Sequence, residues 1–166
     1  ALMLRNDFAT FEVNMASSQL GAYAVPINWH FTPEEASYIL RDSGASVLVA
    51  HTDLLAQTAG GVPERVKVFA APTPDEIATG YAVPDENRRV PSVADSWEQF
   101  VAASAPRTAP PRPSRGSMIY TSGTTGRPKG VRRQPSTPEQ QAAGAQEAAL
   151  FWGLKPDPSI VVLMNG

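Results

Sequence analysis

The sequence predicts an α/β fold in which a parallel-rich sheet is flanked by helices. Helix-like and strand-like patterns alternate through residues 1–71, as they do where each parallel strand is followed by a crossover helix. Residues 46–50 are almost continuously apolar, which is typical of a strand covered on both faces. Apolar residues make up 42% of the 166-residue chain, so it can form a core between such layers.

Two helices with local start and stop signals are predicted first. In the earlier one Asp7 is the expected cap, Gly21 the expected end, and apolar residues recur at helical spacing. These residues are Phe8, Phe11, Met15, Ala16 and Leu20. The later helix starts at Thr32, with proline next and Glu35 three residues on, the signature of a capping box. Gly44 is expected to end it.

Strands and further helices follow in order along the chain. Residues 23–27, 46–50 and 65–70 are predicted strands, and residues 53–59 a helix, which makes residues 1–71 an α/β layer. Residues 72–115 are predicted as an irregular connector, interrupted by a short helix at 95–103 and extended through the proline-rich stretch 104–114. In the last part, 116–166, we expect a strand at 117–120, a helix at 138–152 and a strand at 160–164.

Composition excludes several kinds of site. The chain has no cysteine, which excludes disulfides, thiolate catalysis and cysteine-based zinc sites, and its two histidines, His30 and His51, argue against an all-histidine metal site. No apolar run is long enough to span a membrane, and the first residues lack the order of a signal peptide. We therefore expect a cytoplasmic protein, and because the chain starts without methionine we expect it to begin inside a longer one.

Basic residues are concentrated in one stretch although the net charge is only −2. Residues 88–133 hold nine arginines and lysines but only Asp95 and Glu98 as acids. Such a stretch is locally positive, as a site for an anion would be. A chance cluster of surface arginines is the alternative interpretation at this point.

The composition of residues 121–130 favours binding of a polyphosphate. Glycines let the backbone approach a ligand and turn N–H groups toward an anion, while hydroxyl and ammonium groups donate to phosphate oxygens. The glycines are Gly123, Gly126 and Gly130, and the donors are Thr121, Ser122, Thr124, Thr125 and Lys129. The spacing is neither that of a Walker A loop nor that of a Gly-x-Gly-x-x-Gly turn. The preceding apolar strand argues against a plain flexible linker.

Residues 120–130, which read YTSGTTGRPKG, resemble the signature loop of the acyl-adenylate-forming superfamily. That superfamily includes acyl-CoA synthetases, adenylation domains of peptide synthetases, and luciferases. Residues 21–28, 32–35 and 39–45 are similar to the early part of fatty acyl-CoA ligases. The resemblance implies that 1–166 is an incomplete, amino-terminal AMP-binding domain and that the carboxy-terminal domain is absent.

The resemblance also implies a reaction, in which a carboxylic acid attacks ATP, pyrophosphate leaves, and coenzyme A captures the acyl-adenylate. The loop would hold the β- and γ-phosphates with Mg²⁺: Thr121, Ser122, Thr124 and Thr125 by hydroxyl contacts, Gly123 and Gly126 by backbone approach, and Lys129 by its charge. The acidic metal ligand and the catalytic lysine of the family lie beyond the loop, so no catalytic or metal-binding residue is expected in this chain. Members often carry a histidine shortly after the loop, where this chain has Arg-Arg-Gln-Pro at 132–135.

The resulting prediction is part of a fatty-acid or related carboxylic-acid CoA ligase, inactive on its own. An adenylation domain of a peptide synthetase or an aryl-acid ligase is the nearest alternative, and a noncatalytic nucleotide- or pyrophosphate-binding module is an alternative of another class. Nucleic-acid binding is disfavoured because Trp97, Phe100 and Tyr120, the candidate stacking residues, are expected to be buried. Self-association is expected if surface meant for further strands is exposed.

Overall fold

The computed structural model describes residues 1–58, 60–121, 128–132, 134 and 137–151. The chain forms two compact units, Ala1–Arg133 and Gln134–Gly166, each of which is described by itself. In the second unit the described structure is helix α6, Pro138–Phe151, which agrees with the helix predicted at 138–152. The strand predicted at 160–164 lies outside the described residues.

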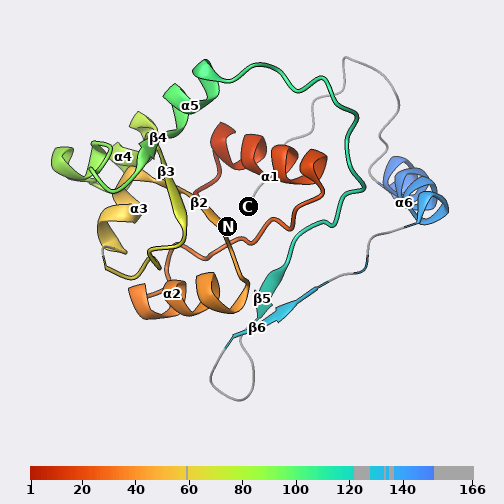
Figure 1. Cartoon of the computed structure of the whole chain (residues 1–166), viewed down its shortest axis with the longest axis horizontal. Helices are drawn as coiled ribbons and strands as arrows, with labels where there is room; N and C mark the ends of the chain where they lie inside the picture. The colour runs from red at the N-terminus through yellow and green to blue at the C-terminus, as the bar shows by residue number, and fades with distance from the viewer. Residues whose placement is uncertain (59, 122–127, 133, 135–136, 152–166) are drawn as a thin grey trace. The chain divides into compact units, whose positions relative to one another are not determined.

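The first unit is built on a parallel sheet of four strands in the order β1-β2-β3-β4 (Figure 1). These are β1 (Leu2–Met3), β2 (Val47–His51), β3 (Lys67–Ala71) and β4 (Asp95–Ser96). Val49 of the central strand β2 pairs with Leu2 on one side and Phe69 on the other. The α/β class and the parallel sheet are thus confirmed. Strand β1 was not predicted, because two residues are too few to show a periodic pattern.

The first two helices begin and end at the predicted signals, whereas the third spans 52–57 in place of the predicted 53–59. Helix α1 (Phe8–Leu20) starts where the Asp7 side chain accepts a hydrogen bond from the N–H of Thr10, and it ends at Gly21, whose φ of 65° is left-handed. Helix α2 (Pro33–Asp42) has the complete capping box between Thr32 and Glu35. Helix α3 (Thr52–Gln57) follows β2 directly.

The segment predicted as a strand at 23–27 forms only isolated parallel bridges. Pro26 pairs with Leu2, and Ala24 pairs with Ser117. The short β1 can offer it only two hydrogen bonds, from Leu2 to Val25 and from Ile27 to Leu2, so no longer ladder develops. The segment nevertheless lies on the side of β1 away from β2, where it extends the sheet by one position.

This position makes the chain reverse direction across the sheet. From β1 the chain passes through α1 to segment 23–27, on the outer side of β1. It then passes through α2 to β2, on the other side of β1. The two helices accordingly pack on opposite faces: Ala9 and Val13 of α1 with Leu2 and Val49, and Ile39 and Leu40 of α2 with Leu48 and Ala50. Opposite faces are what connections of one handedness require when the direction reverses.

The apolar residues that predict α1 by their spacing do not face the sheet. Phe8, Phe11, Met15 and Leu20 are 87%, 57%, 62% and 50% exposed, whereas the small Ala9 and Val13 are buried. Small side chains on that side let the helix approach the strands closely. Helix α1 is therefore apolar on its sheet-facing side and also on its outer side. This pattern is typical of helices that are buried between other parts of a protein.

Residues 72–115 are more ordered than the sequence indicates. They contain α4 (Asp75–Gly80), a 3₁₀ helix η1 (Asp85–Arg88), β4 and α5 (Trp97–Ala103). These elements have two to seven residues, too few for periodicity to reveal most of them. Residues 105–114 form neither helix nor strand.

Helix α5 covers the same sheet face as α1. Trp97 packs edge-on against Phe69 and donates a hydrogen bond of 2.8 Å to Glu12 of α1. Phe100, expected to be buried, is 47% exposed, although its ring lies against both Phe69 and Trp97.

Candidate functional site

The predicted phosphate-binding segment is carried by a β-hairpin, β5 (Ile119–Thr121) and β6 (Lys129–Val131). The strands are antiparallel, and Thr121 pairs directly with Lys129. The structure therefore brings together the two predicted site residues at the base of the loop. The other predicted site residues, Ser122, Gly123, Thr124, Thr125 and Gly126, lie outside the described residues.

The side chains of Thr121 and Lys129 are exposed at this base. In the described part of the chain, Lys129 has no ion-pair partner, whereas Lys67 and Arg88 are paired with aspartates. Lys129 and Thr121 thus offer an ammonium group and a hydroxyl group side by side to an anion.

Gly130 is required by close packing across the hairpin. It pairs with Tyr120, and a Cβ atom added to it would lie 2.7 Å from Cζ of the tyrosine ring and 3.0 Å from its hydroxyl oxygen. No real Cβ tolerates the shorter distance, so the ring can lie over the neighbouring strand only because residue 130 is glycine. Sequence reasoning gave this glycine a role in backbone freedom and missed its cross-strand contact.

Tyr120 also ties the hairpin to helix α2. Its hydroxyl group donates a hydrogen bond of 2.6 Å to Oδ2 of Asp42, the last residue of that helix. Partial burial, and then the hydrogen bond and charge of Asp42, raise the pKa of Tyr120 above its usual value. The phenol therefore stays protonated and keeps its role as a donor at neutral pH.

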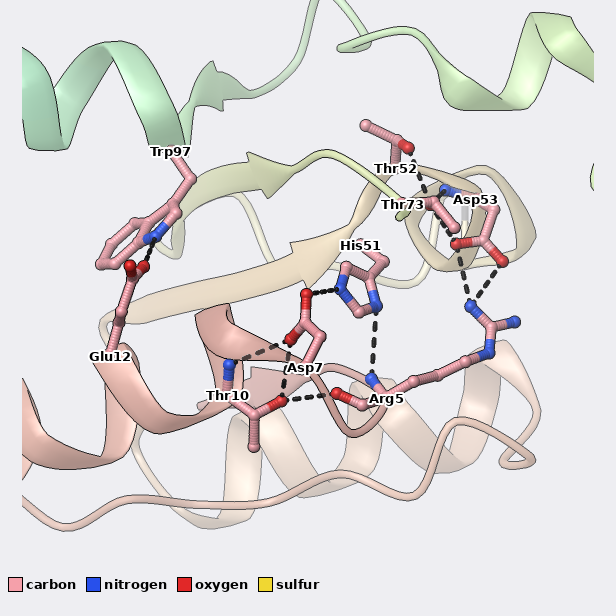
Figure 2. A network of polar contacts seen from close by, with 9 residues as sticks. All are labelled: Arg5, Asp7, Thr10, Glu12, His51, Thr52, Asp53, Thr73 and Trp97. Carbon is pink, nitrogen blue, oxygen red and sulfur yellow. Dashed lines mark hydrogen bonds and ion pairs between the residues drawn. The ribbon is translucent and has the colours of Figure 1, made fainter. Parts of the chain in front are cut away.

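A second polar cluster lies at the carboxyl ends of β1 and β2 (Figure 2). The chain leaves these adjacent strands toward helices on opposite faces, α1 and α3, and such a point in an open α/β sheet usually forms a ligand-binding crevice. Here the space is filled by side chains of the protein itself. They are Arg5, Asp7, His51, Asp53 and Thr73, and sequence reasoning singled out none of them as part of a site.

The Arg5–Asp53 pair is the buried ionic part of this cluster. The two residues are 7% and 1% exposed, and Nη1 of Arg5 lies 2.8 Å from Oδ2 and 3.0 Å from Oδ1 of Asp53. The rings of Trp29 and Tyr81 lie against the guanidinium group, with centroids at 4.8 Å and 4.6 Å. The hydroxyl group of Thr73 donates to Oδ1 of Asp53 at 2.6 Å.

His51 is held in one tautomer. It is fully buried, and its Nδ1 accepts the backbone N–H of Arg5 at 3.2 Å, so Nδ1 carries no proton. The proton is therefore on Nε2, which donates to Oδ2 of Asp7 at 2.9 Å. Partial burial tends to raise the pKa of Asp7, but the hydrogen bonds from His51 and Thr10 lower it below its usual value. Among the described residues, Nε of Arg5 and Oδ2 of Asp53 are buried without a hydrogen-bond partner, although Oδ2 is in ion-pair contact with Arg5. The other polar contacts of the cluster join the ends of β1, β2 and β3, so we assign it a structural role.

His30, in contrast, is exposed and lies over the ring of Trp29. The sequence could have indicated the place of His51 in this cluster, because His51 directly follows the apolar run 46–50. The carboxyl ends of parallel strands meet at one edge of a sheet, so polar side chains that follow such runs come together there. Among the described residues, no three acidic or histidine side chains are grouped so that they could hold a metal ion. Within the same residues, no helix has the length and apolar character needed to cross a membrane.

Comparison with known proteins connects this fold and hairpin to one family. A family model described as AMP-binding enzyme matches residues 1–164. The long-chain-fatty-acid–CoA ligase FadD15 of Mycobacterium bovis is 32% identical over 139 residues, which are 81% of this chain and 22% of the ligase. The fatty acid–[acyl-carrier-protein] ligase ScoC of Streptomyces coeruleorubidus is 31% identical over 122 residues, 73% of this chain and 20% of that protein.

A solved structure shows that the fold is shared. The acyl-CoA synthetase of Brucella canis superposes with a TM-score of 0.63 at 22% identity, over 94% of this chain and 26% of that one. The chain spans about a fifth of the length of the curated relatives that it matches.

Proposed function

The chain belongs to the AMP-binding enzyme family, and from that premise we propose that the whole protein is an ATP-dependent ligase that joins a fatty acid, or a related carboxylic acid, to coenzyme A through an acyl-adenylate. The observation that carries this proposal is the hairpin stem, which sets Thr121 opposite Lys129 at the base of the signature loop, with no ion-pair partner for Lys129 among the residues that the structure describes. The two relatives described above are a fatty-acid–CoA ligase and a fatty-acid–carrier-protein ligase. They support the choice of a fatty acid as substrate class.

The proposed role of the hairpin is to bind the phosphates that leave as pyrophosphate. Negative charge builds up on these phosphates as the acid attacks, and fixed donors that face the charge lower the barrier. Lys129 would supply a positive charge and Thr121 a hydroxyl donor. We propose Ser122, Gly123, Thr124, Thr125 and Gly126 as the remaining phosphate contacts.

Mg²⁺ accompanies ATP in such reactions, and its preferred protein ligands are carboxylates and other oxygen donors. The described hairpin residues include no carboxylate, so they do not fit a magnesium site by themselves. The contribution of this segment is therefore the direct binding of phosphate oxygens.

The test is substitution of Lys129 in the full-length enzyme that contains this chain. Lys129→Ala should lower the rate of ATP–pyrophosphate exchange by about 10²-fold, the usual effect of removing one group that stabilises transition-state charge. Lys67→Ala is the matched control, because Lys67 is an exposed lysine paired with Asp95 at 2.5 Å, in a different strand. Wild-type exchange by Lys129→Ala would refute the assignment.

We further propose that the 166-residue chain alone lacks ligase activity and binds ATP only weakly, since it spans about a fifth of its relatives. Isothermal titration of this chain with ATP separates the proposal from its rival of another class. A noncatalytic nucleotide-binding module would bind ATP tightly as it stands. An aryl acid in place of a fatty acid is the alternative within the family, and a screen of both acid classes with the full-length enzyme decides between them.

Self-association of the 166-residue chain is also proposed, through the outer side of α1. Phe8, Phe11 and Met15, at helical spacing, form an exposed apolar stripe along this helix, and a second copy could cover it by pairing stripe against stripe.

A further inference from the structure

The stem of the hairpin is positioned from outside, by a contact distant in the sequence. Asp42 and Tyr120 are 78 residues apart, and their hydrogen bond of 2.6 Å connects the end of α2 to the middle of β5. The backbone before β5 is fixed separately, by Met118 N–H donating to Ala24 at 2.7 Å and by the buried Met118 side chain. The Asp42 contact comes two residues later, next to the predicted site.

Tyr120 touches both strands of the stem at the positions beside the two site residues. It precedes Thr121 in β5, and its ring lies over Gly130, which follows Lys129 in β6. A change in the position of this ring therefore shifts both Thr121 and Lys129. The missing Cβ at Gly130 is what allows one side chain to control both strands.

Asp42 is in turn held rigidly with respect to the core. Helix α2 begins with a complete capping box and buries Ile39 and Leu40, which are 0% and 1% exposed. Ser43 caps the helix end, and Gly44 turns the chain away with a φ of 68°. The carboxylate thus extends from a fixed point, which suits a residue that sets the place of another.

We propose that Asp42 is a positioning residue of the phosphate-binding hairpin, which acts through the Tyr120 hydroxyl group to hold Thr121 and Lys129 in the orientation that binds the leaving pyrophosphate. This inference rests on the proposed function of the hairpin. It adds Asp42, a residue outside the signature loop, which would affect phosphate binding through the position of Tyr120.

The charge of Asp42 and its proposed positioning role predict opposite effects of its removal on phosphate binding. Asp42 is negative and lies one hydrogen bond away from Tyr120, the neighbour of Thr121, so by simple repulsion its removal should strengthen anion binding, if it has any effect. If it positions the hairpin, its removal should weaken binding. Tyr120→Phe separates the two effects, because it deletes the hydrogen bond and keeps both the Asp42 charge and the ring over Gly130.

The experiment is ATP–pyrophosphate exchange by the full-length enzyme, with KM for pyrophosphate and kcat measured separately. Tyr120→Phe and Asp42→Ala should each raise KM about five- to tenfold, the factor that one hydrogen bond contributes, and the double variant should show the same loss as either single one. Asp42→Asn keeps an oxygen acceptor for Tyr120 and should stay closer to the wild type. Asp75→Ala, which removes an exposed aspartate paired with Arg88, is the control.

A spectroscopic titration checks the contact itself. Asp42→Ala should lower the pKa of Tyr120, and the difference between the alkaline ultraviolet titrations of the wild type and the variant, in the 166-residue chain, measures this change. An unchanged KM in both Tyr120→Phe and Asp42→Ala, or a lower KM in Asp42→Ala, overturns the inference. Lys129→Ala in the same assay shows which idea failed: if it too has no effect, the phosphate-binding role of the hairpin is wrong, and if it alone has an effect, only the role of Asp42 is wrong.

Discussion

Replacing Asp53 with alanine is expected to destabilise the 1–133 unit by about 3 kcal/mol. The substitution leaves the Arg5 guanidinium group charged and 93% buried, given that the residue is 7% exposed, and it removes the acceptor of the Thr73 hydroxyl. Breaking a buried ion pair by deletion of one partner typically costs about 3–5 kcal/mol. The lower end applies because the rings of Trp29 and Tyr81 still cover the cation.

Urea unfolding followed by circular dichroism measures this loss in the 166-residue chain. The matched control is Asp95→Ala, which removes an exposed ion pair with Lys67. The Lys67 and Asp95 side chains are 57% and 59% exposed. An exposed pair contributes about 0–1 kcal/mol, so the control should unfold close to the wild-type midpoint. Replacement of both charges, Arg5→Met with Asp53→Leu, should recover part of the loss because no buried charge remains unpaired.

Equal unfolding free energies for Asp53→Ala and Asp95→Ala would refute this reasoning. That outcome would mean that water reaches Arg5 in solution and that the buried pair adds no more than an exposed one. If Asp53→Ala does not accumulate as a folded protein, Asp53→Asn takes its place in the test. Asparagine keeps the shape of the side chain and one acceptor oxygen, so its unfolding free energy should lie between those of Asp53→Ala and Asp95→Ala.

Three further outcomes are expected. The lowered pKa of Asp7 means that its carboxylate stabilises the fold above its unfolded pKa of about 4 and that this contribution is lost as the pH falls further. Acid titration of unfolding should therefore be steeper in the wild type than in Asp7→Asn, and parallel curves would contradict the assignment. Gly130→Ala should cost about 1–3 kcal/mol by overpacking against Tyr120, and Tyr120→Ala in the same chain should relieve the clash; urea midpoints test both. Phe8→Lys with Phe11→Lys should shift sedimentation toward the monomer, whereas an association unchanged by both would locate the contact elsewhere.

Local signals were sufficient to predict much of the secondary structure. The capping box at Thr32 and Glu35 and the left-handed end at Gly21 depend on residues within a few positions, so the helix ends could be deduced without tertiary contacts. The buried run before His51 likewise identified β2 and, with it, the parallel sheet. The family resemblance rests on the same kind of contiguous pattern.

Contacts between distant parts of the chain were not predictable in this way. The spacing of apolar residues predicted that α1 is a helix but did not indicate which side of the helix faces the sheet. Tertiary packing places the small Ala9 and Val13 against the strands and leaves the large apolar residues outside. The Tyr120–Asp42 hydrogen bond spans 78 residues, and the ring over Gly130 depends on strand pairing. The Arg5–Asp53 pair joins the ends of two strands that only the folded sheet brings together.

The closed crevice at the ends of β1 and β2 separates two properties that many α/β proteins combine in one place. Residues that could have formed a pocket there hold one another, while the proposed ligand contacts are on a hairpin outside the four-stranded sheet. The buried ion pair and the proposed phosphate contacts thus lie on different elements of the fold. During evolution or engineering, the ionic cluster could be exchanged for an apolar one without a change in the residues proposed to bind phosphate. Changes at Tyr120, by contrast, would affect both the hairpin and the core against which it packs.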